Sequence, residues 1–245
     1  MPDTRRHRGP HPQDADLFGQ DQHPALRLAV RDLSWLLSSG YAPRSSLKLV
    51  GDRFGLVERQ RRAVLRSSCS DVALTDRVAR QVTTGQLRGR LIAIDGFNLL
   101  TTVEAALAGG VLLLGRDGAM RDMASMHGSY RKVHETRPAL EMIGRFCDHA
   151  GVAGCHWWLD QPVSNSARLR TIVLELAASR GWHWEVALTP DPDRELSRTD
   201  EIVVTADAAI LDAGPQWHNF ATELVASEAP DAWVVDLREV DLREV

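Results

Sequence analysis

The segment Leu91–Leu100, which reads LIAIDGFNLL, constrains the fold of this chain more than any other. A run of four apolar residues is followed by Asp95, and Gly96 then allows the chain to turn. Asn98 begins a segment whose apolar residues have helical spacing. This order is typical of an α/β protein, in which a buried strand carries an acid to the edge of the sheet where ligands bind. An Asp-Gly pair also turns a chain well without any function, so the segment alone leaves both interpretations open.

From Arg90 onward, short apolar segments alternate with amphipathic ones. This alternation predicts a mainly parallel sheet covered by helices on both faces. We expect core strands at residues 90–94, 155–159, 183–188, 202–205 and 232–235, a hairpin arm at 111–114, and helices at 98–108, 135–150, 164–180 and 216–226. The predicted fold class is therefore α/β, and the predicted α/β domain spans residues 90–240.

The residues before this domain differ in composition. Residues 1–23 are rich in Pro, His, Asp and Gln, which predicts a disordered tail. Residues 24–85 show helical spacing of apolar residues and carry eleven Lys and Arg against five Asp and Glu, which predicts a basic helical domain; residues 85–89 form its linker. Residues 86–245 carry fifteen basic against twenty-four acidic residues. The basic stretch Glu58–Arg66 either follows a phosphate backbone or presents a solvated arginine face.

No apolar run reaches the length of a membrane-spanning helix, and the N-terminus has no secretory signal. Three scattered cysteines fit a reducing compartment. Cys147 and Cys155 are expected to be buried thiols rather than metal ligands. We therefore expect a cytoplasmic protein without a membrane partner. Its oligomeric state stays open, with a homodimer among the alternatives.

Further acids follow the other predicted strands. They are Asp160, Asp207 and, after the strand at 183–188, Asp191 and Asp193. Because parallel strands end at one edge of a sheet, these carboxylates should converge with Asp95. Crowded carboxylates raise one another's pKa unless a cation compensates, and oxygen ligands without Cys or His favour Mg²⁺ or Mn²⁺. The alternative is that each Asp only caps the helix that follows it.

Two short motifs resemble those of PIN-like nucleases, especially the NYN branch. Ile94–Asn98 (IDGFN) is similar to the Asp-Gly-Tyr/Phe-Asn element that ends the first strand in that branch. Val203–Asp207 (VVTAD) resembles the later Thr-Ser-Asp element, and Asp160 stands where the NYN branch has its second-strand acid. The likeness covers roughly residues 90–215. The whole chain also resembles uncharacterised prokaryotic proteins that join a small helical domain to a PIN-like half.

The resemblance implies a three-layer PIN-like sandwich and a ribonuclease that depends on Mg²⁺ or Mn²⁺. Asp95, Asp160 and Asp207 would hold the metal, and Asn98 would orient the first acid or the substrate. PIN-like enzymes usually carry another acid on a helix before their last catalytic strand. Here that region is the Pro-rich segment 189–199, where Asp191, Asp193 and the nearby Asp200 compete; we choose Asp193 as the fourth metal ligand.

The segment Gly115–Arg131 departs from the PIN-like pattern as an insertion. Its residues Arg116, Arg121, Tyr130 and Arg131 suit a substrate-binding loop, because arginines fork onto phosphate and an aromatic ring stacks on a base. A surface loop held by its own Arg–Asp pairs is an equal alternative. His127 in the same segment is a weaker candidate for a general acid.

The sequence as a whole predicts a metal-dependent nuclease that hydrolyses RNA phosphodiester bonds. A catalytically inactive PIN-like protein that binds RNA or protein is the alternative. A phosphatase of the haloacid dehalogenase kind would need a second Asp at position 97, which is Phe. A nucleotide-binding domain would need a glycine-rich loop after the first strand, and the chain has none there.

Overall fold

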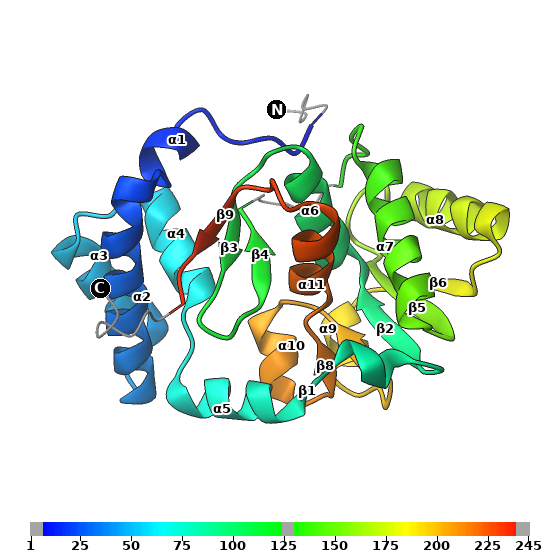
Figure 1. Cartoon of the computed structure of the whole chain (residues 1–245). Coiled ribbons are helices and arrows are strands. Elements are labelled where there is room, and N and C mark those ends of the chain that lie inside the picture. Colours follow the sequence, from blue (N-terminus) through cyan, green and yellow to red (C-terminus); the bar gives the residue numbers. More distant parts are fainter. Residues whose placement is uncertain (1–6, 124–129, 239–245) are drawn as a thin grey trace.

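The computed structural model describes residues 7–123 and 130–238 (Figure 1). Its larger sheet has six parallel strands in the order β1-β8-β7-β2-β5-β6. They are β1 (Gln81–Val82), β2 (Leu91–Asp95), β5 (Gly154–Asp160), β6 (Trp184–Thr189), β7 (Ile202–Val204) and β8 (Trp217–His218). The α/β class and the parallel sheet predicted from the sequence are confirmed. β2, which corresponds to the first strand predicted from the sequence, lies in the interior of the sheet between β7 and β5.

Helices cover both faces of this sheet and make three layers. One face packs against α6 (Gly96–Leu107), α7 (Thr136–Ala150), α8 (Ser166–Arg180) and α11 (Phe220–Glu228), and the other against α9 (Pro192–Leu196) and α10 (Ala208–Ala213). Side chains alternate between the faces of a strand. Ile92 and Ile94 accordingly enter the core under the first layer, and Ala93 the core under the second. No helix in the described part of the chain has the length and apolar character needed to cross a membrane.

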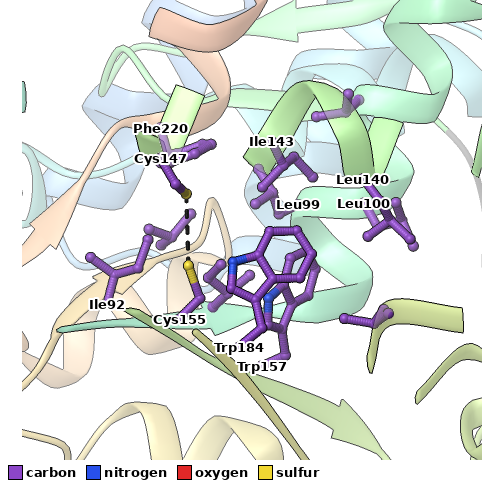
Figure 2. Packing of buried hydrophobic residues seen from close by; sticks show 14 of the residues in the cluster. Ile92, Leu99, Leu100, Leu140, Ile143, Cys147, Cys155, Trp157, Trp184 and Phe220 are labelled. Atoms are coloured by element: carbon purple, nitrogen blue, oxygen red, sulfur yellow. Dashed lines mark hydrogen bonds between the residues drawn. The ribbon is translucent and has the colours of Figure 1, made fainter. Parts of the chain in front are cut away.

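Aromatic rings and thiols fill the larger of these cores (Figure 2). Trp157 and Trp184, on neighbouring strands, pack with ring centroids 5.1 Å apart. Cys147 of α7 and Cys155 of β5 place their Sγ atoms 3.7 Å apart, and both are free and buried, as the sequence predicts. The hydrogen bond with Cys155, together with burial, raises the pKa of Cys147 well above its ordinary value. This thiol therefore stays protonated at neutral pH.

A second sheet of three short strands lies between the large sheet and the N-terminal helices (Figure 1). It consists of β4 (Met120–Asp122), β3 (Leu112–Leu114) and β9 (Val234–Asp236), in that order. The hairpin predicted at 111–114 is present, since β3 and β4 are antiparallel. The strand predicted at 232–235 is displaced to β9 and pairs with β3, not with the large sheet. The helix predicted over 216–226 begins only at Phe220, because Trp217 and His218 form the short strand β8 between β1 and β7. A short apolar run does not distinguish a strand from a helix.

The basic N-terminal region contains four helices. They are α2 (His23–Ser38), α3 (Pro43–Arg53), α4 (Glu58–Ser67) and α5 (Asp71–Arg80). Leu33 and Val64 of this region share a hydrophobic core with Leu113 of β3 and Val235 of β9. The linker expected at 85–89 is partly a 3₁₀ helix, η2 (Thr84–Leu87), and Leu87 is buried in the large core. The helical and α/β regions are therefore joined by a common core.

The tail predicted over residues 1–23 is wrong for its described residues. Residues 7–22 include α1 (Asp14–Leu17) and η1 (Gln20–Gln22), and Phe18 is completely buried. Arg8 Nε donates to Glu104 Oε2 at 2.8 Å, and Arg59 donates to both carboxylate oxygens of Asp14. Polar composition predicts disorder only where the charges stay solvated. Here specific ion pairs bury them, and composition does not reveal such pairs.

Arg8→Met should lower the free energy of unfolding by about 3–5 kcal/mol, because removing one partner leaves a buried charge uncompensated. The carboxylate of Glu104 is fully buried and keeps only the hydroxyls of Tyr130 and Thr136 in the variant. Denaturant unfolding measures the change. Arg31, which pairs with Asp32 and is 48% exposed, supplies the control, since Arg31→Met should cost less than about 1 kcal/mol. Equal stability of the two variants would contradict a structural role for the N-terminal segment.

Candidate active site

The order of the strands creates a crevice at the carboxyl edge of the large sheet. From β2 the chain continues to β5 and β6 on one side, and then crosses back to β7 and β8 on the other. The connections after β2 and β7 therefore leave in opposite directions, and ligands bind at such a switch point in open α/β sheets. A cleft of about 510 Å³ lies there.

Six carboxylates line this cleft, together with Asn98, Thr101 and Arg66. The acids are Asp95 at the end of β2, Asp122 on β4, Asp160 at the end of β5, Asp191 and Asp193 at the start of α9, and Asp207 after β7. The structure thus brings together all four acids expected to bind metal, although they are far apart in the sequence. Asp200, the remaining candidate in its segment, does not line the cleft.

Hydrogen bonds join the loops after β2 and β7 at the floor of the cleft. Thr205 Oγ1 donates to Asp95 Oδ2 at 2.8 Å, and the Asp207 N–H donates to the same hydroxyl oxygen at 3.0 Å. The Ala206 N–H donates to Asn98 Oδ1 at 2.9 Å. Thr205 and Asn98 therefore hold Asp95 beside the Asp207 loop.

Burial and, after it, repulsion between neighbouring carboxylates raise the pKa of three of these acids. Desolvation, reinforced by the charges of Asp207 and Asp193, raises the pKa of Asp95 to about 7 despite the hydrogen bond from Thr205. Desolvation and then the charges of Asp207, Asp191 and Asp160 raise the pKa of Asp193. The pKa of Asp160 is raised by desolvation and by Asp191. These carboxylates are thus close enough to disfavour simultaneous ionisation, and a cation would relieve them.

Three of the acids also cap helices, which was the alternative interpretation of the motif. Asp95 Oδ1 accepts from the Asn98 N–H, Asp191 Oδ1 from the Arg194 N–H, and Asp207 Oδ1 from the Ala209 N–H. Each cap occupies one oxygen of a carboxylate. Capping therefore fixes the direction of the side chain, while the other oxygen of Asp191 and Asp207 has no hydrogen bond within the described residues.

The donors in the cleft fit a hard divalent cation. They are carboxylate, amide and hydroxyl oxygens, which Mg²⁺ and Mn²⁺ prefer. Asp160 Oδ1 is buried without a hydrogen-bond partner in the described part of the chain, as expected of an atom that awaits a ligand. Within residues 7–123 and 130–238, however, no group of three or more His, Cys, Asp or Glu side chains is arranged to hold a metal ion. The acids are gathered in one cleft but not around one point.

Two of the residues expected to bind substrate are buried elsewhere. Arg121 is 5% exposed and bound to Asp117, with distances of 2.8 and 2.6 Å, and donates to the Ala206 carbonyl behind the cleft. Burial opposes ionisation of Asp117, but Arg121 and Arg77 lower its pKa to about 2. Tyr130 is 1% exposed and donates to Glu104, so its ring is not available to a base. The loop held by its own Arg–Asp pair is the arrangement found.

The other residues of this insertion also lie outside the cleft. Arg116 forms an ion pair with Asp71 of α5 at 2.7 Å. Arg131 is exposed to solvent. Neither side chain lines the acidic cleft. His127 falls outside the described residues.

Sequence patterns did not select two residues that line the cleft. Asp122 is 3% exposed, and the hydroxyls of Thr101 and Thr102 donate to it. It lies on a three-residue strand of the second sheet, so no strand-end pattern marks it. Arg66 comes from the last turn of α4, a region more than twenty residues before the first acid. Asp122 could have been selected as an acid within the insertion Gly115–Arg131, and Arg66 as the last residue of the basic stretch Glu58–Arg66.

Asp95→Asn should stabilise the metal-free protein above pH 7. Between about pH 4 and pH 7 the folded state holds a proton on Asp95 that the unfolded chain has lost, so the free energy of unfolding falls as pH rises through this window. The variant should lack this slope and gain about 1–2 kcal/mol at pH 8, a rise in Tm of about 2–8 °C. Thermal unfolding in a chelating buffer measures it, with Asp200→Asn as control. An unchanged pH slope would contradict the raised pKa.

Comparison with known proteins divides the chain at the junction between the two regions. Residues 25–80, the four helices, match a family described as a protein of unknown function (DUF434), and residues 84–223 match a domain of unknown function (DUF5616). The Uncharacterized protein MJ0935 of Methanocaldococcus jannaschii is 27% identical over 189 residues, which cover 76% of this chain and 89% of that protein. No solved structure matches. The second match spans more than half of the chain, and it includes five of the six strands of the large sheet and the six acids that line the cleft, so the protein belongs to the DUF5616 family.

Proposed function

We propose that the protein is a PIN-like, metal-dependent ribonuclease that hydrolyses RNA phosphodiester bonds. The observation that carries the proposal is the cleft at the switch point of the sheet, which six carboxylates line and in which burial and neighbouring acids raise the pKa of Asp95 and Asp193. Such crowding lowers stability, and perturbed acids of this kind gather at functional sites. Asp95, Asn98 and Asp207 belong to the two sequence motifs that resemble the NYN branch, and all three line this cleft.

Asp95, Asp160, Asp193 and Asp207 would hold Mg²⁺ or Mn²⁺ in this cleft. A bound divalent ion supplies charge that neutralises the phosphate and activates water for in-line attack. Without a cation the carboxylates repel the phosphate backbone, so RNA binding in the cleft should itself depend on the divalent ion. Asp122, buried beside Thr101, adds negative charge at the wall of the cleft.

The remaining contacts organise the acids. The Thr205 hydroxyl and the Asn98 N–H each donate to Asp95, and therefore fix both of its oxygens. The side-chain oxygen of Asn98 accepts a hydrogen bond from the Ala206 N–H, so Asn98 orients the loop that carries Asp207. Its role in the proposal is to position two acids, one at each side of the switch point.

Purified protein should cleave single-stranded RNA with Mg²⁺ or Mn²⁺ and not with a chelator. Asp207→Asn should lower the rate by about a hundredfold or more, since loss of even an outer partner of a metal ligand costs about ten- to hundredfold. Asp200→Asn removes an equal charge outside the cleft and should cleave normally. A gel assay with labelled RNA and circular dichroism of each variant provide the measurement.

Two outcomes would contradict the proposal in different ways. RNA binding without cleavage under all divalent ions would favour the inactive RNA-binding platform. Equal cleavage by Asp207→Asn and the wild type would show that the acidic cleft does not carry the activity.

A further inference from the structure

Arg66 lies where the acidic cleft opens into a second cavity. This adjoining groove, of about 630 Å³, runs between the N-terminal helices and α10. Arg66, Asn98 and Asp207 line both the cleft and the groove. The two cavities are therefore continuous, and α4 supplies a cation at their junction.

The Arg66 side chain has no hydrogen bond or ion pair within the described residues, and its Nε is buried without an acceptor. Other arginines of α4 are engaged: Arg59 with Asp14 at 2.5 Å and Arg61 with Asp52 at 2.8 Å. A buried donor without an acceptor is costly. Arg66 lies beside a cleft of carboxylates but is bound to none of them, so it is available to an anion that enters.

The other cations of the groove are already neutralised. Arg77 donates to Asp117 at 2.6 Å and to Asp212, and Arg121 also pairs with Asp117. Further along, the groove is lined by Tyr41, whose ring is 59% exposed. Among the described residues, the groove thus offers a free guanidinium, Arg66, near the acids and an exposed aromatic ring beyond it. This combination suits a single strand, in which a phosphate binds the arginine and an unpaired base stacks on the ring.

We propose that Arg66 binds a backbone phosphate of single-stranded RNA, next to the phosphate in the acidic cleft, and that Tyr41 stacks on a base of the same strand. The proposal rests on the proposed nuclease function and gives the helical region its part in it. The groove between the helices and α10 holds the nucleotides that flank the site of cleavage.

The first experiment compares Arg66→Met with Arg53→Met. Arg53 is an exposed arginine of the same region that lines neither cavity. Binding of a fluorescein-labelled single-stranded RNA of about a dozen nucleotides is measured by anisotropy over a range of salt concentrations, with Ca²⁺ as the divalent ion. Arg66→Met should raise Kd about tenfold or more. It should also reduce the slope of log Kd against log salt by about 0.7, the loss of one phosphate contact. Arg53→Met should leave both unchanged.

The second experiment tests the aromatic contact with exposed residues, whose replacement leaves the fold intact. Tyr41→Ala should weaken binding about fivefold to a hundredfold, and Tyr41→Phe should retain it. Trp35, which is 65% exposed and lines neither cavity, supplies the control Trp35→Ala. A duplex of the same sequence should bind more weakly than the single strand, and equal or tighter binding of the duplex would overturn the proposal.

Cleavage by the wild type with Mn²⁺, measured in parallel, separates the two proposals. If the wild type cleaves RNA but Arg66→Met binds and cleaves like Arg53→Met, the role of Arg66 is wrong and the nuclease function stands. If the wild type neither binds nor cleaves RNA, the nuclease function fails and the role of Arg66 fails with it.

Discussion

The pairing of β2 with β7 across the switch point is the constraint on which the site depends. It places Asp95 beside Thr205, and the hydrogen bond between them, with the Ala206–Asn98 bond, joins two loops more than a hundred residues apart in the sequence. The other acids of the cleft lie around these two joined loops. Because the strands are parallel, the same edge also receives the ends of β5 and β6, and with them Asp160 and Asp191.

The cleft works against stability. Desolvation and neighbouring carboxylates raise the pKa of Asp95 to about 7, whereas Asp117, buried between Arg77 and Arg121, has a pKa of about 2. Burial raises the pKa of Asp95, whereas two arginines lower the pKa of the buried Asp117. Asp117 is compensated within the protein and holds the second sheet, α5 and the Asp207 loop together. Asp95 accepts hydrogen bonds from Thr205 and Asn98 but has no ion pair with a basic side chain within the described residues, and under the proposed function the divalent cation would supply the missing charge.

The small sheet explains why the helical and α/β regions pack together. Its strands bury Leu113 and Val235 in one core with Leu33 and Val64 of the helices. This packing fixes α4 against the acidic cleft, and Arg66 at the end of α4 becomes part of the cleft wall. Arg59 and Arg61 of the same helix are held in structural ion pairs, so within the described residues a helix that is strongly basic in sequence presents Arg66 to the cleft.

The sequence by itself determined the strands that carry the acids, because period-two and apolar patterns report local burial, and strand ends then place Asp95, Asp160 and Asp207 at one edge. It also determined the helical character of residues 24–85 and the buried thiols. Tertiary structure decided the rest. The ion pairs that fold residues 7–22, the burial of Tyr130 and Arg121, the transfer of β9 to the second sheet and the approach of Arg66 and Asp122 to the cleft all join segments far apart in the chain. Their energies come from partners that no local pattern contains, since a charge or a ring has the same sequence signal whether it is solvated, paired or buried.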